Sequence, residues 1–235
     1  MRDHRSEAAW QRDERPRRSV PALWLLPLSH PAPSVALSTE EQAWADGLPT
    51  PRSDHYCWSR RWMRYLLAEL LQVNAAALPL LAPPGRAPEL ARGWGFVSLS
   101  HCPDALAVAW SPWRIGVDLE RTDRRIPADA LLRRFFCASE REALLALNRE
   151  QLRQAVLEHW LCKESAIKWQ RGSLARDLAH WCCAVDGTGV VDQRVGTQLH
   201  ACLWRQGVWT LALVAAQGDV DAGVNPRHQA MLCLA

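Results

Sequence analysis

The spacing of apolar residues alternates between the period of a strand and that of a helix along this chain, and this alternation limits the folds that the chain can adopt. The first half reads as a strand, two helices and then strands, and the second half as helices followed by strands. Each half therefore has the elements to pack helices on a sheet. We expect an α+β fold of two similar halves, at 20–111 and 112–216, with tails at 1–19 and 217–235.

Local signals set the expected elements of each half. The spacing of Ser38 and Glu41 predicts a capping box at the start of one helix, and that of Ser139 and Glu142 predicts a second. The Pro- and Ala-rich stretch at 75–88 is typical of a surface connection. The expected helices lie at 37–48, about 53–73, 127–136, 139–147 and 150–169. The expected strands lie at 22–29, in an antiparallel meander at 94–101, 105–110 and 114–120, and in HWCCAVD, TQLHACLW and VWTLALVA.

Composition and charge exclude several classes of protein. A net charge of +3 is too small to drive nonspecific binding to nucleic acid. No stretch reaches the roughly 20 apolar residues that span a bilayer, and the N-terminal segment has no apolar core of a signal peptide. The eight cysteines include no CxxC pair, so we expect reduced and mostly buried thiols. These features predict a cytoplasmic protein that binds neither nucleic acid nor a membrane.

The expected strand at 114–120 carries a pair of acidic side chains. Side chains alternate along a strand, so the three large apolar residues share a buried face while Asp118 and Glu120 project together from the other. Gly116 leaves space beside them. Two carboxylates placed in this way repel each other unless a cation lies between them, and an all-oxygen site favours Mg²⁺. The alternative is a solvated strand end.

The expected helix at 150–169 brings a charged pair onto its apolar face. At 100° per residue, Glu164 and Lys168 fall on the same stripe as three apolar residues, with Lys163 and His159 beside it and closer to solvent. Burial of a charged pair is costly unless the pair is matched or faces a cleft, so it indicates a site. A simple ion pair at a helix edge stays an alternative. The segment also holds both lysines of the chain, and a lysine suits a phosphate because its ammonium is a mobile point charge.

Three short segments together resemble the 4′-phosphopantetheinyl transferases, in the larger, Sfp-type class with two halves in one chain. IGVDLE resembles the pattern G-V/I-D-x-E, WLCKESAIK resembles W-x-x-K-E-x-x-x-K, and SLSHC lies where the family has a histidine-containing strand. The resemblance extends over residues 20–216 and implies two pseudo-symmetric α/β subdomains with the active site in the cleft between them. It implies a monomer that, with Mg²⁺, transfers the 4′-phosphopantetheine arm of coenzyme A to a serine of an acyl or peptidyl carrier protein and releases adenosine 3′,5′-bisphosphate.

The resemblance also assigns roles to residues of this chain. The expected Mg²⁺ ligands are Asp118, Glu120 and Glu164. Glu164 is also the expected base for the serine hydroxyl, with Lys168 and Lys163 as phosphate-binding residues. The residues expected to contact coenzyme A are His101, Ser100, Arg64, Arg60 and Lys168. The residues expected to dock the carrier protein are Arg124, Arg125, Ile126 and Leu131.

Two other functions stay open on the sequence alone. One is a non-catalytic module that binds coenzyme A or a carrier protein on the same scaffold. Such a module has no need of the acidic set. The other is a structural interaction domain, in which Glu164 and Lys168 form only a surface ion pair.

Overall fold

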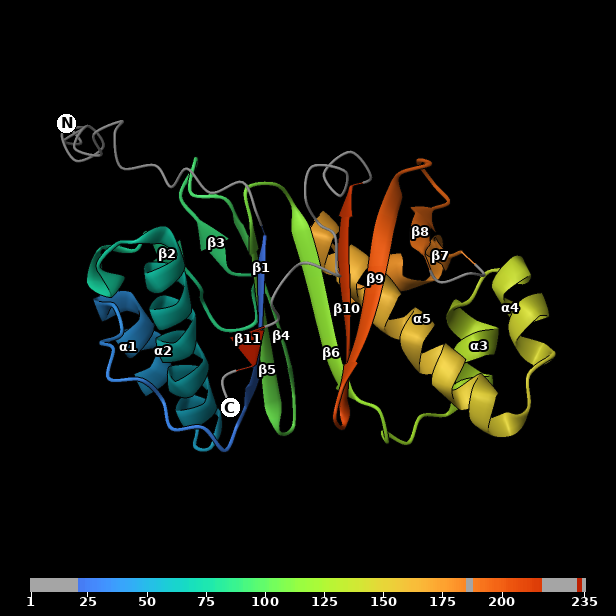
Figure 1. The fold of residues 1–235 in the computed structure, drawn as a ribbon, viewed down its shortest axis with the longest axis horizontal. Coiled ribbons are helices and arrows are strands. Elements are labelled where there is room, and N and C mark those ends of the chain that lie inside the picture. The colour runs from blue at the N-terminus through green and yellow to red at the C-terminus, as the bar shows by residue number, and fades with distance from the viewer. Residues whose placement is uncertain (1–20, 185–187, 217–231, 234–235) are drawn as a thin grey trace.

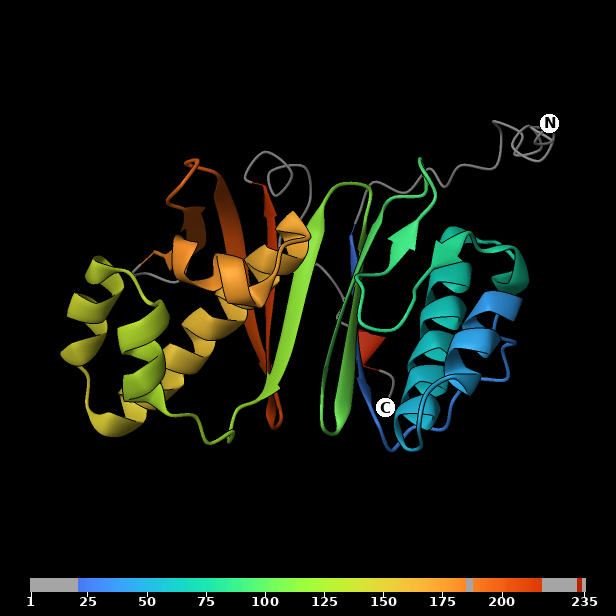
Figure 2. The same ribbon diagram turned by 180° about the vertical axis from the view of Figure 1, so that it is seen from behind.

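The computed structural model describes residues 21–184, 188–216 and 232–233, so the expected N-terminal tail and most of the expected C-terminal tail lie outside the described residues. In the described part, two sheets lie next to each other and the long helices lie on their outer faces (Figure 1). The view from behind shows the same succession of layers (Figure 2). The expected α+β fold is confirmed. No helix in these ranges is both long and apolar enough to cross a bilayer.

The first sheet has the strand order β11-β1-β5-β4 and is covered by the long helix α2. The capping box at the start of α1 is confirmed, since the Ser38 hydroxyl accepts from the Glu41 nitrogen and the Glu41 carboxylate accepts from the Ser38 nitrogen. The elements of this half are β1 (Ala22–Pro27), α1 (Thr39–Asp46), α2 (Arg52–Leu71), a 3-10 turn (Ala75–Ala77), β2 (Leu80–Leu81), β3 (Glu89–Leu90), β4 (Phe96–Cys102) and β5 (Ala105–Ser111).

The second sheet has the strand order β6-β10-β9-β8-β7 and is covered by the long helix α5. Strand β8 falls in a segment where the sequence pattern predicted none. The elements of this half are β6 (Ile115–Arg121), α3 (Ala128–Phe135), α4 (Ala138–Leu145), α5 (Arg149–Gln170), α6 (Leu174–Asp177), a 3-10 turn (Leu178–His180), β7 (Trp181–Cys183), β8 (Gly189–Asp192), β9 (Gln198–Gln206) and β10 (Trp209–Ala216). Strand β11 (Leu232–Cys233) returns to the first sheet, where it pairs in parallel with β1.

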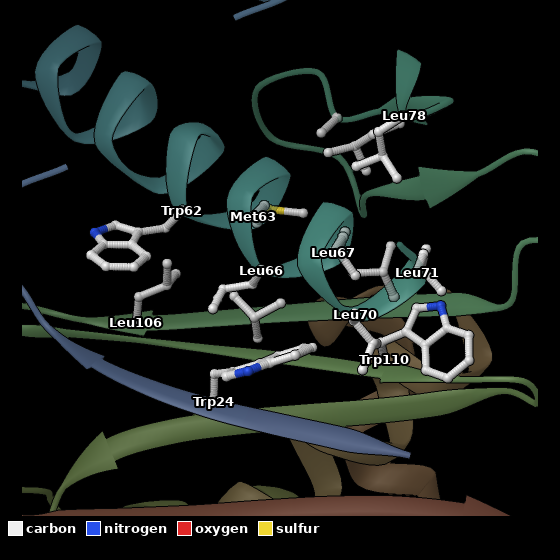
Figure 3. Packing of buried hydrophobic residues seen from close by; sticks show 14 of the residues in the cluster. Trp24, Trp62, Met63, Leu66, Leu67, Leu70, Leu71, Leu78, Leu106 and Trp110 are labelled. Atoms are coloured by element: carbon white, nitrogen blue, oxygen red, sulfur yellow. The ribbon is translucent and has the colours of Figure 1, made fainter. Parts of the chain in front are cut away.

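Three apolar layers hold this arrangement together. Helix α2 packs Trp62, Met63 and Leu66 on one face of the first sheet (Figure 3). Helix α5 packs on the second sheet in a similar way, through Leu157 and Leu161 among others. Between the sheets, small residues of β5 meet branched residues of β6 and β10. Burial of one large apolar side chain contributes about 1.5–3 kcal/mol, so this inner layer holds the two halves in a defined relation.

The chain crosses from one sheet to the other between Ser111 and Ile115. On this basis we propose subdomain boundaries at 20–111 and 112–216. The expected meander is wrong in its third strand: β4 and β5 pair with each other, but β6 pairs with β10 in the second sheet. The expected C-terminal tail is wrong at its end, because this segment contains β11.

The structure corrects three further expectations about the elements and the cysteines. The second capping box starts at Cys137 with Glu140, not at Ser139, because the Glu140 carboxylate accepts from the Cys137 nitrogen. A disulfide joins Cys137 to Cys182, so the expectation of reduced cysteines is wrong for this pair. The expected surface connection at 75–88 also contributes buried apolar side chains to the core beside α2.

Candidate active site

A glycine lets helix α5 lie directly against strand β6. A Cβ atom on Gly116 would lie 2.0 Å from the carbonyl oxygen of Ser165 and 2.7 Å from the amide nitrogen of Trp169. Both neighbours are backbone atoms of α5, so no larger residue fits without displacing the helix. The Ser165 hydroxyl also donates to the Ala212 carbonyl oxygen at 2.9 Å, which ties α5 to β10. Residues on the same face of β6 as Gly116 therefore project beside α5.

Asp118 receives two hydrogen bonds on one carboxylate oxygen. The side chain is buried, and its Oδ1 accepts from Lys168 Nζ at 2.7 Å and from the Ser100 hydroxyl at 2.6 Å. Asp118 comes from β6, Lys168 from α5 and Ser100 from β4. The structure thus brings together Asp118 and Lys168, which lie 50 residues apart in the sequence.

Glu164 lies one helical turn before Lys168. Burial and then the negative charge of Asp118 raise the pKa of Glu164 to about 7. The positive charge of Lys168 and a hydrogen bond with Trp160 act in the opposite direction and offset only part of this effect. A carboxyl group with such a pKa exchanges its proton readily near neutral pH, which is what a general base requires.

The three expected Mg²⁺ ligands fit the ion in kind. All are carboxylates, and the raised pKa of Glu164 beside Asp118 indicates a shortage of positive charge that a divalent cation would supply. Their oxygens are not gathered around one point, however. Among the described residues, two groups bring three possible ligand atoms within 4.8 Å of one another, and neither group includes Asp118, Glu120 or Glu164. Glu120 instead forms an ion pair with Arg124, so holding one ion requires the pairs of Asp118 and Glu120 to rearrange.

A cleft of about 870 Å³ opens beside these residues, lined by both halves of the chain. Glu164 and Lys168 line it, whereas Asp118 and Glu120 are not among its lining residues. Basic side chains outnumber the acidic ones in the lining, which suits a ligand with several phosphate groups. The basic residues that line the cleft are Arg52, His55, Arg60, Arg86, His101, Arg114, Lys168 and Arg171.

Two histidines meet in the wall of the cleft. The rings of His55 and His101 lie 5.1 Å apart, edge to face. Burial lowers the pKa of His101, and the positive charges of His55, Lys168 and Arg60 lower it further. An anion bound beside His101 would act in the opposite direction. Sequence reasoning missed His55 in this site, since no local pattern marks it and only the fold brings it to His101.

Arg64 is not available to a ligand, which corrects its expected contact with coenzyme A. Its buried guanidinium donates from Nε to Glu41 at 2.5 Å and from another nitrogen to the Ala75 carbonyl oxygen at 2.9 Å. Arg60 does line the cleft, with its Nε donating to the Ala82 carbonyl oxygen at 3.0 Å. Ser100 is not among the lining residues.

Lys163 does not lie beside Lys168 in the site, and this expectation is wrong. Its ammonium is fully buried and donates to Glu140 at 2.8 Å and to two backbone carbonyl oxygens. His159 is buried too, with its Nδ1 3.0 Å from the same carboxylate. Burial alone would lower the pKa of His159, but its contacts with Cys183 and Glu140 raise it to about 9. Lys163 and His159 therefore anchor α5 to α4 and β7, and neither lies near solvent as expected.

The residues expected to dock a carrier protein lie just after β6 and on α3. Arg124 and Arg125 are exposed, and Arg124 pairs with Glu120. Ile126 and Leu131 are half-buried and pack against the small core around α3, α4 and α5. Part of each apolar side chain is therefore used within the molecule.

Comparison with protein families matches residues 114–221 to the family described as the 4′-phosphopantetheinyl transferase superfamily. The matched region includes β6 and α5, which carry Asp118, Glu164 and Lys168. A comparison with curated proteins finds no match. Residues 114–221, which include the contact of β6 and α5 around Asp118, are therefore similar to the 4′-phosphopantetheinyl transferase superfamily.

Proposed function

We propose that this protein transfers the 4′-phosphopantetheine arm of coenzyme A to a serine of an acyl or peptidyl carrier protein. The observation that carries the proposal is the position of Glu164 and Lys168 in the wall of a basic cleft, next to buried Asp118. Without a bound metal the carboxyl group of Glu164 has a pKa of about 7, and in its ionised form it supplies a base. The ammonium of Lys168 supplies a phosphate contact. The other basic side chains offer a surface for a substrate with several phosphates.

In the proposed reaction, the serine hydroxyl oxygen forms a bond to the phosphorus that carries the pantetheine arm. The phosphoanhydride bond breaks, and adenosine 3′,5′-bisphosphate leaves. Glu164 in its ionised form takes the hydroxyl proton, directly or through a water molecule. Lys168 donates to a phosphate oxygen and stabilises charge that develops as the bond breaks. Mg²⁺ held by Asp118, Glu120 and Glu164 would supply neutralisation of the diphosphate charge.

The proposed partner is an acidic carrier protein that docks along the segment 124–131. Exposed Arg124 and Arg125 would attract it, and the exposed parts of Ile126 and Leu131 would provide apolar contact. We propose a monomer, since both walls of the cleft come from one chain. The cytoplasmic location expected from the sequence stays a proposal.

A non-catalytic binding module is the second function class, and one feature argues against it. Asp118 and Glu164 place two carboxylates beside a cleft that otherwise suits anions. Without a catalytic or metal-binding role, these groups would only repel a polyphosphate ligand.

The test is to incubate the protein with an apo-carrier, coenzyme A and Mg²⁺ and to measure the mass of the carrier. We expect a gain of one phosphopantetheine group, lost when EDTA is added and strongly reduced in Glu164→Gln. No gain with several diverse carriers would contradict the proposal, and so would a gain that EDTA leaves unchanged.

A further inference from the structure

Strands β4 and β6 are edge strands of different sheets, and serine side chains connect them. β6 pairs its backbone with β10 on one side, and no backbone pairing to β4 occurs within the described ranges. Instead, the Ser98 hydroxyl accepts from the Val117 nitrogen at 3.0 Å, and the Ser100 hydroxyl accepts from the Leu119 nitrogen at 3.2 Å. Both serines are buried. The hydroxyl groups of Ser98 and Ser100, two residues apart on β4, thus accept from β6 in place of the backbone carbonyl oxygens of a neighbouring strand.

Ser100 differs from Ser98 in one further bond. A hydroxyl group has a single proton, and in Ser100 that proton goes to Asp118 Oδ1 at 2.6 Å. Lys168 Nζ donates to the same oxygen at 2.7 Å. In the described part of the chain, no hydrogen bond reaches the second oxygen of Asp118, Oδ2. Ser98 makes only its bond with the Val117 nitrogen among the residues that the structure describes, and none of their carboxylates bonds to it.

We propose that Ser100 is a positioning residue, which holds Asp118 so that Oδ2 stays available to a divalent cation. The proposal rests on the proposed function for the identity of the site. Because the Ser100 hydroxyl is itself fixed by the Leu119 nitrogen, the orientation of Asp118 depends on the contact between the two halves. Loss of the hydroxyl frees the carboxylate to turn and to offer both oxygens to Lys168. This role replaces the expected contact of Ser100 with coenzyme A.

The test compares Ser100→Ala with Ser98→Ala, which removes the same kind of backbone bond. Mn²⁺ binding to the free protein, without coenzyme A or carrier, is measured by electron paramagnetic resonance. Mutation of a group that orients a metal ligand typically weakens metal affinity by about 10- to 100-fold. We therefore expect at least about tenfold weaker Mn²⁺ binding in Ser100→Ala, a change below about twofold in Ser98→Ala, and similar losses of thermal stability in both.

Further variants separate positioning from a purely structural role. Ser100→Thr, which retains a hydroxyl group, should recover Mn²⁺ affinity, and Ser100→Ala should have no further effect on it once Asp118→Asn is present. Equal weakening of Mn²⁺ binding by the two alanine variants would overturn the proposal. A Ser100→Ala variant with normal Mn²⁺ affinity and a raised KM for coenzyme A would overturn it too.

The Mn²⁺ measurement involves no transfer reaction, so failure of the proposed function can be distinguished from failure of the positioning role of Ser100. If the wild-type protein modifies no carrier but Ser100→Ala alone weakens Mn²⁺ binding, the transferase proposal fails and the positioning role stands. If the wild-type protein modifies carriers and both alanine variants bind Mn²⁺ alike, the positioning role fails and the transferase proposal stands.

Discussion

Replacement of Gly116 by alanine tests how the close approach of α5 to β6 builds the site. The added Cβ would lie 2.0 Å from the Ser165 carbonyl oxygen, where real Cβ contacts are essentially never below 3.0 Å. The obstacle is helix backbone, which has no rotamer that could move away. Helix α5 must therefore shift by about 1 Å or more, or β6 must bend by a similar amount.

This shift has two measurable consequences. Overpacking of a core typically destabilises a protein by about 1–3 kcal/mol, so we expect a loss of that size in the free energy of unfolding. Glu164 and Lys168 move with α5, and a displacement of about 1 Å in a catalytic group can reduce a rate by about 10²-fold. Activity should thus fall by about two orders of magnitude at a temperature where the variant is still folded.

Denaturant unfolding and the carrier mass assay at low temperature would measure the two effects. Gly47→Ala is the matched control, since a Cβ there has no neighbour nearer than 3.6 Å and its φ of −83° suits any residue. The control should stay within about 1 kcal/mol of wild type and keep its activity. Full activity in Gly116→Ala would refute the view that the α5–β6 distance positions the site.

Three further predictions follow from individual side chains. Without metal, the raised pKa of Glu164 favours the folded state below pH 4.5, and this contribution is lost as the pH rises to about 7. In urea unfolding, Glu164→Gln should therefore be more stable than wild type by about 1–3 kcal/mol above pH 7 and equal to it near pH 4. A stability difference that is constant with pH would contradict this. Lys163→Met leaves buried Glu140 without its main cation, and urea unfolding should detect a loss of about 3–5 kcal/mol; an unchanged midpoint would contradict the anchoring role. Lys168→Arg should reduce kcat in the mass assay about tenfold or more while stability changes little, because a planar guanidinium cannot follow a phosphate as an ammonium does; full turnover would refute the phosphate role.

Elements with strong local signals could be predicted from the sequence. The Ser38–Glu41 capping box starts α1 as expected, because both of its hydrogen bonds lie within four residues. The partner of β6 could not be predicted in this way, since its pairing with β10 joins residues about 90 positions apart and competes with the nearer β5. The strand itself was recognisable, but the sheet it joins depends on the whole second half.

The two lysines show the same limit within the site. Lys163 and Lys168 lie in one motif, and a helix turns by about 500° over five residues, so their side chains point about 140° apart. The packing of α5, which includes its close contact with Gly116, brings Lys168 to Asp118 and Lys163 to Glu140. The contact of Arg64 with coenzyme A is expected from the resemblance alone. Its buried ion-pair partner, Glu41, lies on another helix.

The central claim is that three carboxylates from β6 and α5 hold one divalent ion against a diphosphate. Crystals grown with coenzyme A and Mn²⁺ would test it through the anomalous signal of the manganese. We predict one strong peak bounded by Asp118, Glu120 and Glu164 and next to the diphosphate of the ligand. Ordered coenzyme A in the cleft with no peak there, or with the ion bound instead at the buried group of Glu140, His159 and Cys183, would contradict the claim.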